Sequence, residues 1–389
     1  MAEPRTFARR TRTDLLLIVE EATSKRNVSS SARNVTRQGS RVVAVRIATF
    51  NANNLFSRWS FQAELPRTVA HLPRAEIAAE AAETVVAPGS GQPSVVEVVL
   101  PDGTRMSGVL RTFRGKLVKG KDPKAREWIA RRIAALNADV LCLQEVEDQD
   151  ALDTFHRDDL RPLGVDYRYR VVVEGNDPRR IDVAICSRLP ITRISSWRYW
   201  PDHTGEPVFG RDLLQAQITT PDGTALHVFV NHLKSNFIAD EHTLTPAEVT
   251  AARHAINRRR TEQATAITQI LRRQRLTRRI VITGDLNDTP HAATLTPLRQ
   301  ANLTEQIHQG TTTAGPDRNG HLIDDTFADL SPTIWTHRHR AKGITTFALY
   351  DQIWTSPDLT VTAAHVMRRT QISGDGSDHD PAYIDLALA

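Results

Sequence analysis

Residues 42–51 read VVAVRIATFN, a run of apolar and β-branched residues that stops at an asparagine-rich turn over residues 51–54. A short run of this composition predicts a buried strand over Val42–Phe50. The run Asp139–Leu143 has the same character and is followed directly by Gln144 and Glu145. Buried strands that end in carboxylate and amide side chains indicate a sheet whose strand ends carry the function.

Similar apolar runs alternate with helical patterns along the rest of the chain. Apolar residues at helical spacing predict helices over Lys124–Leu136 and Arg259–Arg273. Cys142 and Cys186 lie inside predicted strands, which indicates buried packing thiols, and two cysteines in 389 residues exclude a disulfide framework. The further predicted strands are Tyr169–Val173, Ile181–Cys186, Leu213–Ile218, Leu226–Val230, Ile280–Thr283, Gln352–Thr355 and Ala382–Leu386.

The segment Ser57–Asp122 separates the first predicted strand from the first predicted helix. It combines an Ala/Glu-rich helical pattern over Arg74–Val86 with a hairpin, in which Val95–Leu100 and Met106–Leu110 flank a Pro-Asp-Gly turn. We therefore expect a single catalytic domain over residues 41–389, with an inserted segment at about residues 57–122.

The basic charge of the chain is concentrated near its N-terminus. The formal net charge is +5, and residues 1–40 hold eight Lys or Arg and four Asp or Glu, so the other 349 residues carry only +1. Bulk charge therefore gives no evidence for a nucleic-acid partner. We expect residues 1–40 to be a disordered basic segment. No apolar run reaches the roughly 7–15 residues of a signal peptide or the roughly 20 of a membrane span. We expect a cytoplasmic location, no transmembrane segment and a monomer.

Polar clusters recur at the ends of the predicted strands. Each alone is a weak signal, but together they deliver Asn, Asp, Glu and His from strands far apart in the sequence. Oxygen ligands of this kind suit Mg²⁺, which takes one or two carboxylates and keeps waters for a substrate phosphate. The clusters are Asn51–Asn54, Gln144-Glu145, Asn231–Ser235, Gly284–Asp288 and Ser377–Pro381.

Six short strings, taken in order along the chain, are similar to those of the endonuclease/exonuclease/phosphatase superfamily. The resemblance implies an α+β fold, the deoxyribonuclease-I-like four-layer α/β/β/α sandwich with two packed mixed β-sheets. It also implies Mg²⁺- or Mn²⁺-dependent cleavage of phosphate esters. The strings are Ile47–Asn51, Leu143–Glu145, Asn231–Ser235, Gly284–Asn287, Tyr350–Ile353 and Ser377–His379.

The resemblance assigns a metal site to three of these residues. Glu145 resembles the main metal-binding carboxylate, Asn51 resembles a ligand or a neighbour of the ligands, and Asp378 resembles the other acid of the site. Many relatives carry an acid two residues after the first asparagine, where this chain has Asn53. A neutral amide there disfavours a second tightly bound metal on that side.

The resemblance also assigns catalytic roles. His379 resembles the general base or transition-state stabiliser, and Asp351 resembles the partner that orients its imidazole. His232 resembles the second histidine, which contacts the phosphate or protonates the leaving oxygen. Asp285 and Asn287 resemble the pair that positions the water and a phosphate oxygen.

Four weaker assignments complete the expected site. Asn231, Lys234 and Arg180 are candidate phosphate-binding residues at or near strand ends. Asp182 resembles an acid that supports His232, although a charge at the start of a strand is nearly as good an explanation.

Three functions compete on the sequence. The leading hypothesis is a metal-dependent phosphodiesterase acting on DNA as an endonuclease or exonuclease. The second is a phosphatase or lipid phosphodiesterase of the same fold, and the third, a non-catalytic binding module, is disfavoured because every expected histidine and carboxylate is present. The insertion offers basic residues for DNA and aromatic residues for a lipid surface. These are Arg111, Arg114, Lys116, Lys119 and Lys121 on one side, and Trp59 and Phe61 on the other.

Overall fold

The computed structural model describes most of the chain from residue 34 onward. The helix predicted over Arg74–Val86 lies outside the described residues, and so does the predicted disordered segment except for residues 34–37 and 40. Of the candidate substrate contacts in the insertion, only the side chain of Lys121 is described; those of Trp59, Phe61, Arg111, Arg114, Lys116 and Lys119 are not. The described ranges are 34–37, 40–56, 60–64, 94–99, 105–110, 114–118, 120–316, 322–323, 334–341, 343–369 and 376–388.

The chain divides into two compact units. One comprises residues 1–57 and 121–389, and the other comprises residues 58–120. In the smaller unit β3 (Ser60–Glu64) pairs with β6 (Arg114–Val118), and β4 (Ser94–Val99) pairs with β5 (Arg105–Leu110), all antiparallel. The β4–β5 pair is the hairpin predicted from the sequence. On the larger unit, the backbone N–H of Lys121 donates to the carbonyl of Phe56 at 2.9 Å, so the chain leaves and re-enters that unit at one point.

The larger unit contains two mixed sheets. The eight-stranded sheet has the order β15-β21-β22-β2-β7-β9-β8, with β1 paired to β2, and the six-stranded sheet has the order β10-β11-β12-β13-β20-β14. Every strand predicted for this unit is found. The strands of the first sheet are β1 (Asn34–Arg37), β2 (Ser40–Leu55), β7 (Val140–Val146), β8 (Tyr169–Val172), β9 (Asp182–Ser187), β15 (Thr311–Thr313), β21 (Thr360–Met367) and β22 (Ala382–Leu388). Those of the second are β10 (Ile191–Ser196), β11 (Leu213–Thr219), β12 (Ala225–His232), β13 (Ile280–Asp285), β14 (Thr304–Glu305) and β20 (Asp351–Thr355).

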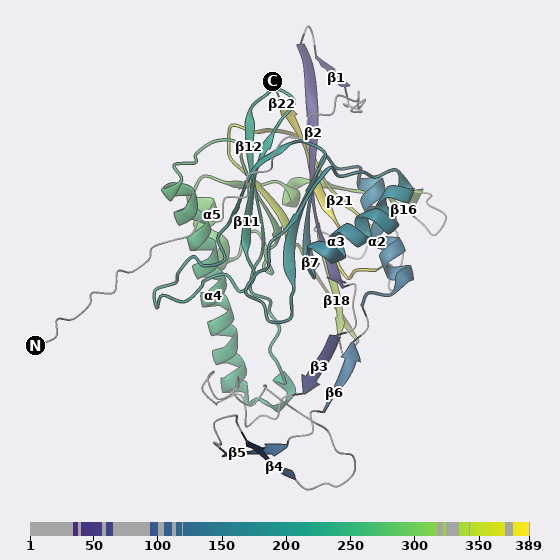
Figure 1. Cartoon of the computed structure of the whole chain (residues 1–389). Helices are drawn as coiled ribbons and strands as arrows, with labels where there is room; N and C mark the ends of the chain where they lie inside the picture. The colour runs from purple at the N-terminus through teal and green to yellow at the C-terminus, as the bar shows by residue number, and fades with distance from the viewer. Residues whose placement is uncertain are drawn as a thin grey trace, which may run out of the picture. The chain divides into compact units, whose positions relative to one another are not determined.

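Helices cover the outer face of each sheet, which gives the expected α/β/β/α sandwich (Figure 1). One apolar core lies between the sheets and includes Ile47 and Val228. A second core joins the eight-stranded sheet to α2 (Pro123–Leu136) and α3 (Gln149–Phe155), and a third joins the six-stranded sheet to α4 (Pro246–Arg273) and α5 (Thr296–Gln300). The remaining short elements are η2 (His156–Leu160), η3 (Arg161–Leu163), η4 (Glu241–Thr243), η5 (Ala293–Leu295), η6 (Ile307–Gln309), β16 (Gly315–Pro316), β17 (Leu322–Ile323), β18 (His337–Ala341) and β19 (Ile344–Ala348).

The two long helices begin at well-formed caps. The side chain of Asp122 accepts from the backbone N–H of Lys124 at 2.9 Å, and Pro123 takes the first helical position of α2. Helix α4 begins with a capping box between Thr245 and Glu248. The helix starts at residue 246, well before the predicted residue 259. The apolar pattern did not predict the first half, because that half is mostly exposed and carries no apolar stripe.

Strand register brings the functional strand ends to one edge. β2 runs parallel to β7, and β12 runs parallel to β13, with His232 opposite Asp285. β20 runs antiparallel to β13, so Asp351 at its start lies opposite Asp285 at the end of β13. β22 likewise runs antiparallel to β2, which places the residues before β22 beside the end of β2. Residues remote in sequence therefore meet at one end of the sandwich.

The cysteine prediction is confirmed. Cys142 in β7 and Cys186 in β9 are free and fully buried. Burial raises the pKa of the Cys186 thiol to about 12, so it stays a packing group at neutral pH. Over the described part of the chain, no helix has both the length and the apolar character needed to cross a membrane.

Candidate active site

Asn51 joins two carboxylates from different sheets. Its Nδ2 donates to Oδ2 of Asp285 at 3.0 Å and to Oε1 of Glu145 at 3.3 Å. Glu145 has a φ of +63° and lies at an irregularity of β7, because Gln144 pairs with Val183 and Val146 pairs with Asp182, which leaves Glu145 without a ladder partner. A bulge of this kind re-aims a side chain, and here it turns the carboxylate toward Asn51.

Asp351 and His379 form a buried ion pair. Oδ2 of Asp351 lies 2.7 Å from Nδ1 of His379, and Nε2 on the other side of the ring lies 3.8 Å from Oδ2 of Asp285. Burial alone would lower the pKa of His379, but the charge and hydrogen bond of Asp351 outweigh it and raise that pKa to about 10. The imidazole is therefore held in one orientation and carries a positive charge at neutral pH.

Asp285 lies between the two histidines. Its Oδ2 is 3.4 Å from Nε2 of His232, and its Oδ1 accepts from the backbone N–H of Asn287 at 2.9 Å. Burial raises the pKa of Asp285 to about 6, with the positive charge of His379 opposing and the negative charge of Asp351 reinforcing the shift. Burial, followed by the nearby cations Arg211 and His379, lowers the pKa of His232 well below its usual value, so His232 is neutral.

Asn287 and Asn231 hold the strand-end loops. Asn287 has a φ of +53°, and its Nδ2 donates to the carbonyl of Leu233 at 3.2 Å, which fastens the loop after β13 to the end of β12. Asn231 is fully buried, and its Oδ1 has no hydrogen-bond partner. Nδ1 of His232 and Oδ1 of Asp351 are also buried without a partner. Unpartnered buried polar atoms around one point indicate a site that takes up a polar ligand.

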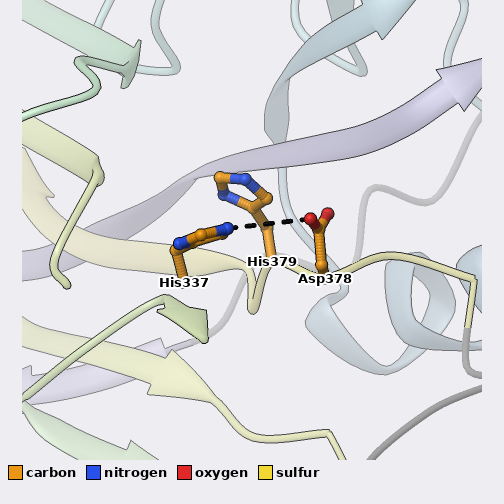
Figure 2. A group of neighbouring side chains, drawn as sticks. All are labelled: His337, Asp378 and His379. Carbon is orange, nitrogen blue, oxygen red and sulfur yellow. Dashed lines mark ion pairs between the residues drawn. The ribbon is translucent and has the colours of Figure 1, made fainter. Parts of the chain in front are cut away.

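Asp378 faces a histidine that the sequence analysis did not single out. Its Oδ2 lies 3.6 Å from Nε2 of His337, while its Oδ1 accepts from Nδ2 of Asn53 at 2.8 Å. Figure 2 shows His337 and Asp378 pointing toward one another, with the ring of His379 beside the line that joins them. His337 begins β18, a strand with no apolar alternation, and no pattern in the sequence linked it to the other site residues.

The segment that carries Asp378 and His379 is fixed by buried charge. Asp380 is fully buried and pairs with Arg132 at 2.6 Å, Arg369 at 3.0 Å and Arg368 at 3.4 Å. The guanidinium of Arg132 also donates to the carbonyl of His379 at 3.1 Å. Because Arg132 belongs to α2, the helix and the catalytic segment are locked together.

A basic group lies beside His232 and was mostly missed from the sequence. Arg211 is buried and pairs with Asp177 at 3.1 Å, and the exposed Arg179 pairs with the same carboxylate at 2.8 Å. Burial lowers the pKa of Lys234, and the charges of Arg211 and Arg179 lower it further, so the three cations are neighbours. Arg211 and Asp177 lie in loops before β11 and β9, where no strand-end pattern marks them.

Lys121 closes the side of the site next to Asn53. Its ammonium donates to the carbonyl of Asn53, which has a φ of +46°. Burial lowers the pKa of Lys121 to about 8, while the carboxylates of Glu145 and Asp378 act in the opposite direction. The sequence suggested Lys121 as a DNA contact, and the structure places it against the turn that links Glu145 to Asp378.

Arg180 and Asp182 lie at a cavity beside β9. They line this cavity of about 250 Å³ together with Glu147, Asp148, Gln149, Val172 and Glu174. Oδ1 of Asp182 accepts from the backbone N–H of Gly175 at 2.9 Å, and burial raises the pKa of Asp182 to about 6. The acid that contacts His232 is Asp285, at 3.4 Å, and support of His232 by Asp182 stays a prediction.

The donor set fits a hard divalent cation. Glu145 and Asp285 present carboxylates on either side of the Asn51 amide, and carboxylate oxygens are the usual ligands of Mg²⁺ and Mn²⁺. Burial raises the pKa of Asp285 and the negative charge of Asp351 raises it further, so a cation beside this carboxylate would favour its charged form.

Known proteins give independent comparisons. A solved structure of an endonuclease/exonuclease/phosphatase family protein from Bacteroides thetaiotaomicron is 12% identical over 90% of this chain and 100% of its own, with a TM-score of 0.46. One from Beutenbergia cavernae is 16% identical over 89% of this chain and 72% of its own, with a TM-score of 0.47. Another is D. rerio TDP2 complexed with a single-strand DNA product, 14% identical over 68% of this chain and 91% of its own, with a TM-score of 0.42. No curated protein sequence matches.

A sequence model of a whole family gives the assignment. The model of the endonuclease/exonuclease/phosphatase family matches residues 114–379, which is more than half of the 389 residues. Members of this family are generally hydrolases of phosphoester bonds that depend on a divalent metal. With its two packed mixed sheets and this match, the chain belongs to the endonuclease/exonuclease/phosphatase family and has the phosphoesterase fold of that superfamily.

Proposed function

We propose that this protein is a Mg²⁺- or Mn²⁺-dependent phosphodiesterase whose substrate is DNA. The observation that carries the proposal is the convergence of Glu145, Asp285 and His232 with the Asp351–His379 pair at one edge of the sandwich. This group combines oxygen donors for a cation, a charged imidazole and a neutral one around a common carboxylate. Hydrolysis of a phosphodiester needs those elements to place water and to neutralise the charge that gathers on phosphate oxygens.

The proposed metal-holding residues are Glu145 and Asn51, with Asp378 on the far side of Asn53. When bound there, Mg²⁺ or Mn²⁺ supplies Lewis acidity toward a phosphate oxygen. The amide of Asn51 donates to the carboxylates of both Glu145 and Asp285, and these two hydrogen bonds fix the carboxylates relative to one another. Asn53 is neutral and already donates to Asp378, which favours one tightly held cation rather than two.

His379 acts in this proposal as a positively charged donor. Asp351 holds its Nδ1, so the opposite N–H at Nε2 points to the space around Asp285 and donates to a phosphate oxygen. A histidine whose pKa is raised to about 10 is a poor proton acceptor at neutral pH. Of the two roles that the sequence left open for His379, the raised pKa therefore favours stabilisation of the transition state.

Asp285 is the better proton acceptor. Its pKa of about 6 lies close to neutral pH, and its Oδ2 is near both histidines. We assign it the proton of the attacking water: the water oxygen bonds to phosphorus, its proton passes to Oδ2, and the bond from phosphorus to the leaving oxygen breaks. The neutral His232 donates one N–H to the phosphate, and Asn287 keeps the Asp285 carboxylate in place.

The preference for DNA rests on the basic group beside the site. Arg211 lies next to His232, and Arg179 and Lys234 extend the positive charge outward from it. A run of cations from the scissile phosphate to the surface suits a substrate with several phosphates in a row. Their partner Asp177 orients the two guanidinium groups without neutralising both.

A lipid phosphodiester is the second candidate, and one observation favours it. Phe237 is 70% exposed in the loop after Lys234, and Ile344 is 67% exposed at the start of β19, in the hairpin that begins at His337. Large apolar side chains on loops beside a phosphoesterase site are what contact with a membrane surface requires.

A metal-supplemented substrate panel tests both proposals. Purified protein is given Mg²⁺ or Mn²⁺ with plasmid DNA, single strands, RNA, abasic duplex, inositol phosphates or phospholipid vesicles, and product is measured over time. We expect DNA cleavage that is abolished in His379→Ala and Glu145→Ala. His227→Ala is the control, because His227 lies on β12 five residues before His232 and outside the site. Equal rates for wild type and His379→Ala would contradict the enzyme assignment, and activity on vesicles alone would select the lipid substrate.

A further inference from the structure

The cluster His337, Asp378 and His379 has a donor set different from that of the Glu145 site. One ligand atom from each of the three residues can be chosen so that all lie within 4.8 Å of one another. Two of these donors are imidazole nitrogens, whereas the Glu145 site offers oxygens. Imidazole and carboxylate together suit Zn²⁺ and other late transition metals, and Mg²⁺ prefers oxygen and water.

The position of His337 is built into the fold. Its backbone forms an isolated antiparallel bridge with His379, and the backbone N–H of Asp380 donates to the carbonyl of Thr336 at 2.7 Å. The ring of His337 stacks on Tyr350, with the ring centroids 5.1 Å apart and an interplanar angle of 21°. The hairpin β18–β19 is therefore fastened to the catalytic segment at the residue that brings a second imidazole.

We propose that His337, Asp378 and His379 form a Zn²⁺ site that inhibits the enzyme. Tetrahedral ligands about 2.0–2.1 Å from zinc are separated by about 3.3–3.5 Å. Nε2 of His337 and Oδ2 of Asp378 are already 3.6 Å apart, so these two groups bind without a large movement. The two imidazole rings have centroids 4.7 Å apart, with Asp378 next to both (Figure 2).

The third ligand, His379, is oriented by the carboxylate of Asp351, which bonds the ring nitrogen Nδ1. Asp351 occupies Nδ1 of His379, so Nε2 is the nitrogen left for a metal, and its proton is released to solvent when Zn²⁺ binds. A carboxylate behind a ligating histidine is the usual arrangement at zinc sites, where it fixes the ring and increases its basicity. The three protein ligands leave a fourth position for water.

Zinc at this cluster blocks the reaction because it takes the nitrogen that the phosphate needs. This consequence rests on the proposed function, in which Nε2 of His379 donates to a phosphate oxygen. Asp378 is shared with the residues proposed to hold Mg²⁺, but the two imidazole ligands are not, so added Mg²⁺ competes with Zn²⁺ only at Asp378. His337 enters the reaction only through this zinc site.

The test compares two histidines of one strand, His337 and the exposed His339. Zn²⁺ binding to wild type, His337→Gln and His339→Gln is measured by calorimetry in excess Mg²⁺, without substrate. Loss of an outer-shell partner alone weakens metal binding about 10- to 100-fold, and loss of a direct ligand costs at least as much. We therefore expect at least a tenfold loss in His337→Gln and none in His339→Gln, with the Zn²⁺ concentration for half-inhibition shifted by the same factor.

Cobalt gives a second measurement that does not depend on catalysis. Co²⁺ bound to wild type should show the intense visible bands of tetrahedral coordination, and His337→Gln should lack them. Equal Zn²⁺ affinity in wild type and a folded His337→Gln, or a Co²⁺ spectrum that this change leaves intact, overturns the proposal. If no substrate is hydrolysed, the proposed function fails while the binding and spectral results still decide the zinc site.

Discussion

The carboxylate of Asp351 and the imidazole of His379 lie 2.7 Å apart in a buried pair, in which Asp351 begins β20 and His379 lies three residues before β22. They belong to different sheets, so the pair exists only when the two sheets pack. Catalytic geometry is thereby tied to the packing of the sandwich core.

Substitution of Asp351 by Asn is expected to lower the pKa of His379, because the charge that raises it to about 10 is removed. The imidazolium then loses its proton at lower pH, and the alkaline limb of the kcat profile moves to lower pH. The rate at neutral pH falls about 10²- to 10⁴-fold, the usual contribution of a positioned acid or base. NMR titration of the histidine in the metal-free protein checks the shift directly, and an unchanged His379 titration in Asp351→Asn would sink this account.

Asp212 gives a prediction about stability rather than catalysis. It is buried with Oδ2 unpartnered, and burial raises its pKa to about 7. A carboxyl with a raised pKa holds its proton in the folded state while the unfolded chain has released it. The free energy of unfolding therefore falls as pH rises from about 4 to about 7, by roughly 1.4 kcal/mol per unit of pKa shift. Urea denaturation at pH 5 and pH 8 measures this loss, and Asp212→Asn should not show it. If the free energy of unfolding of Asp212→Asn fell between the two pH values as much as that of wild type, the prediction would be contradicted.

Gly284 is expected to tolerate no side chain. It has a φ of +137°, and a Cβ there would lie 1.9 Å from the carbonyl oxygen of Asn231 on the adjacent strand β12. Gly284→Ala combines backbone strain with overpacking, each of which costs about 1–3 kcal/mol. Gly223→Ala is the matched control, since Gly223 also has a positive φ, +78°, but nothing lies within 4 Å of the added carbon. Thermal unfolding should show a much larger loss for Gly284→Ala, and equal losses would refute the steric argument.

Salt dependence separates DNA from a lipid substrate. If Arg179 and Lys234 contact successive phosphates, each substitution by Ala should raise KM for DNA and reduce the slope of log affinity against log salt by about 1. Arg193→Ala is the control, because Arg193 is exposed on β10 outside the basic group. No change in slope for either variant, together with loss of vesicle activity in Phe237→Ser, would favour the lipid substrate instead.

The strands and the polar strand ends could be predicted because both depend on local patterns. The apolar run before Asn51 and the run before Glu145 mark buried strands, and their parallel pairing brings the two polar ends together. The ordered strings then indicated which of these ends act as one site. The bulge that turns Glu145 toward Asn51 left no trace in the sequence, because it depends on the pairing of β7 with β9.

The residues that the sequence did not predict depend on contacts between distant segments or lie in exposed structure without an apolar pattern. Arg211 and Asp177 lie in loops, and their pairing depends on where two separate strands begin. His337 belongs to a hairpin without apolar alternation, so the sequence showed neither that this residue is partly buried nor that it lies beside Asp378 and His379. The first half of α4 is solvent-exposed, and its helical state is marked only by the cap at Thr245.

The hydrogen bond between Lys121 and Phe56 has a consequence for how such a protein diversifies. Since the chain leaves and rejoins the sandwich through one bonded pair, residues 57–120 form a cassette whose removal breaks no strand order in either sheet. A short turn can bridge the pair, because the backbone N–H of Lys121 and the carbonyl oxygen of Phe56 already lie 2.9 Å apart. The sequence and length of this cassette can therefore vary without changing the strand order that holds the catalytic edge, although the cassette begins only three residues after Asn54.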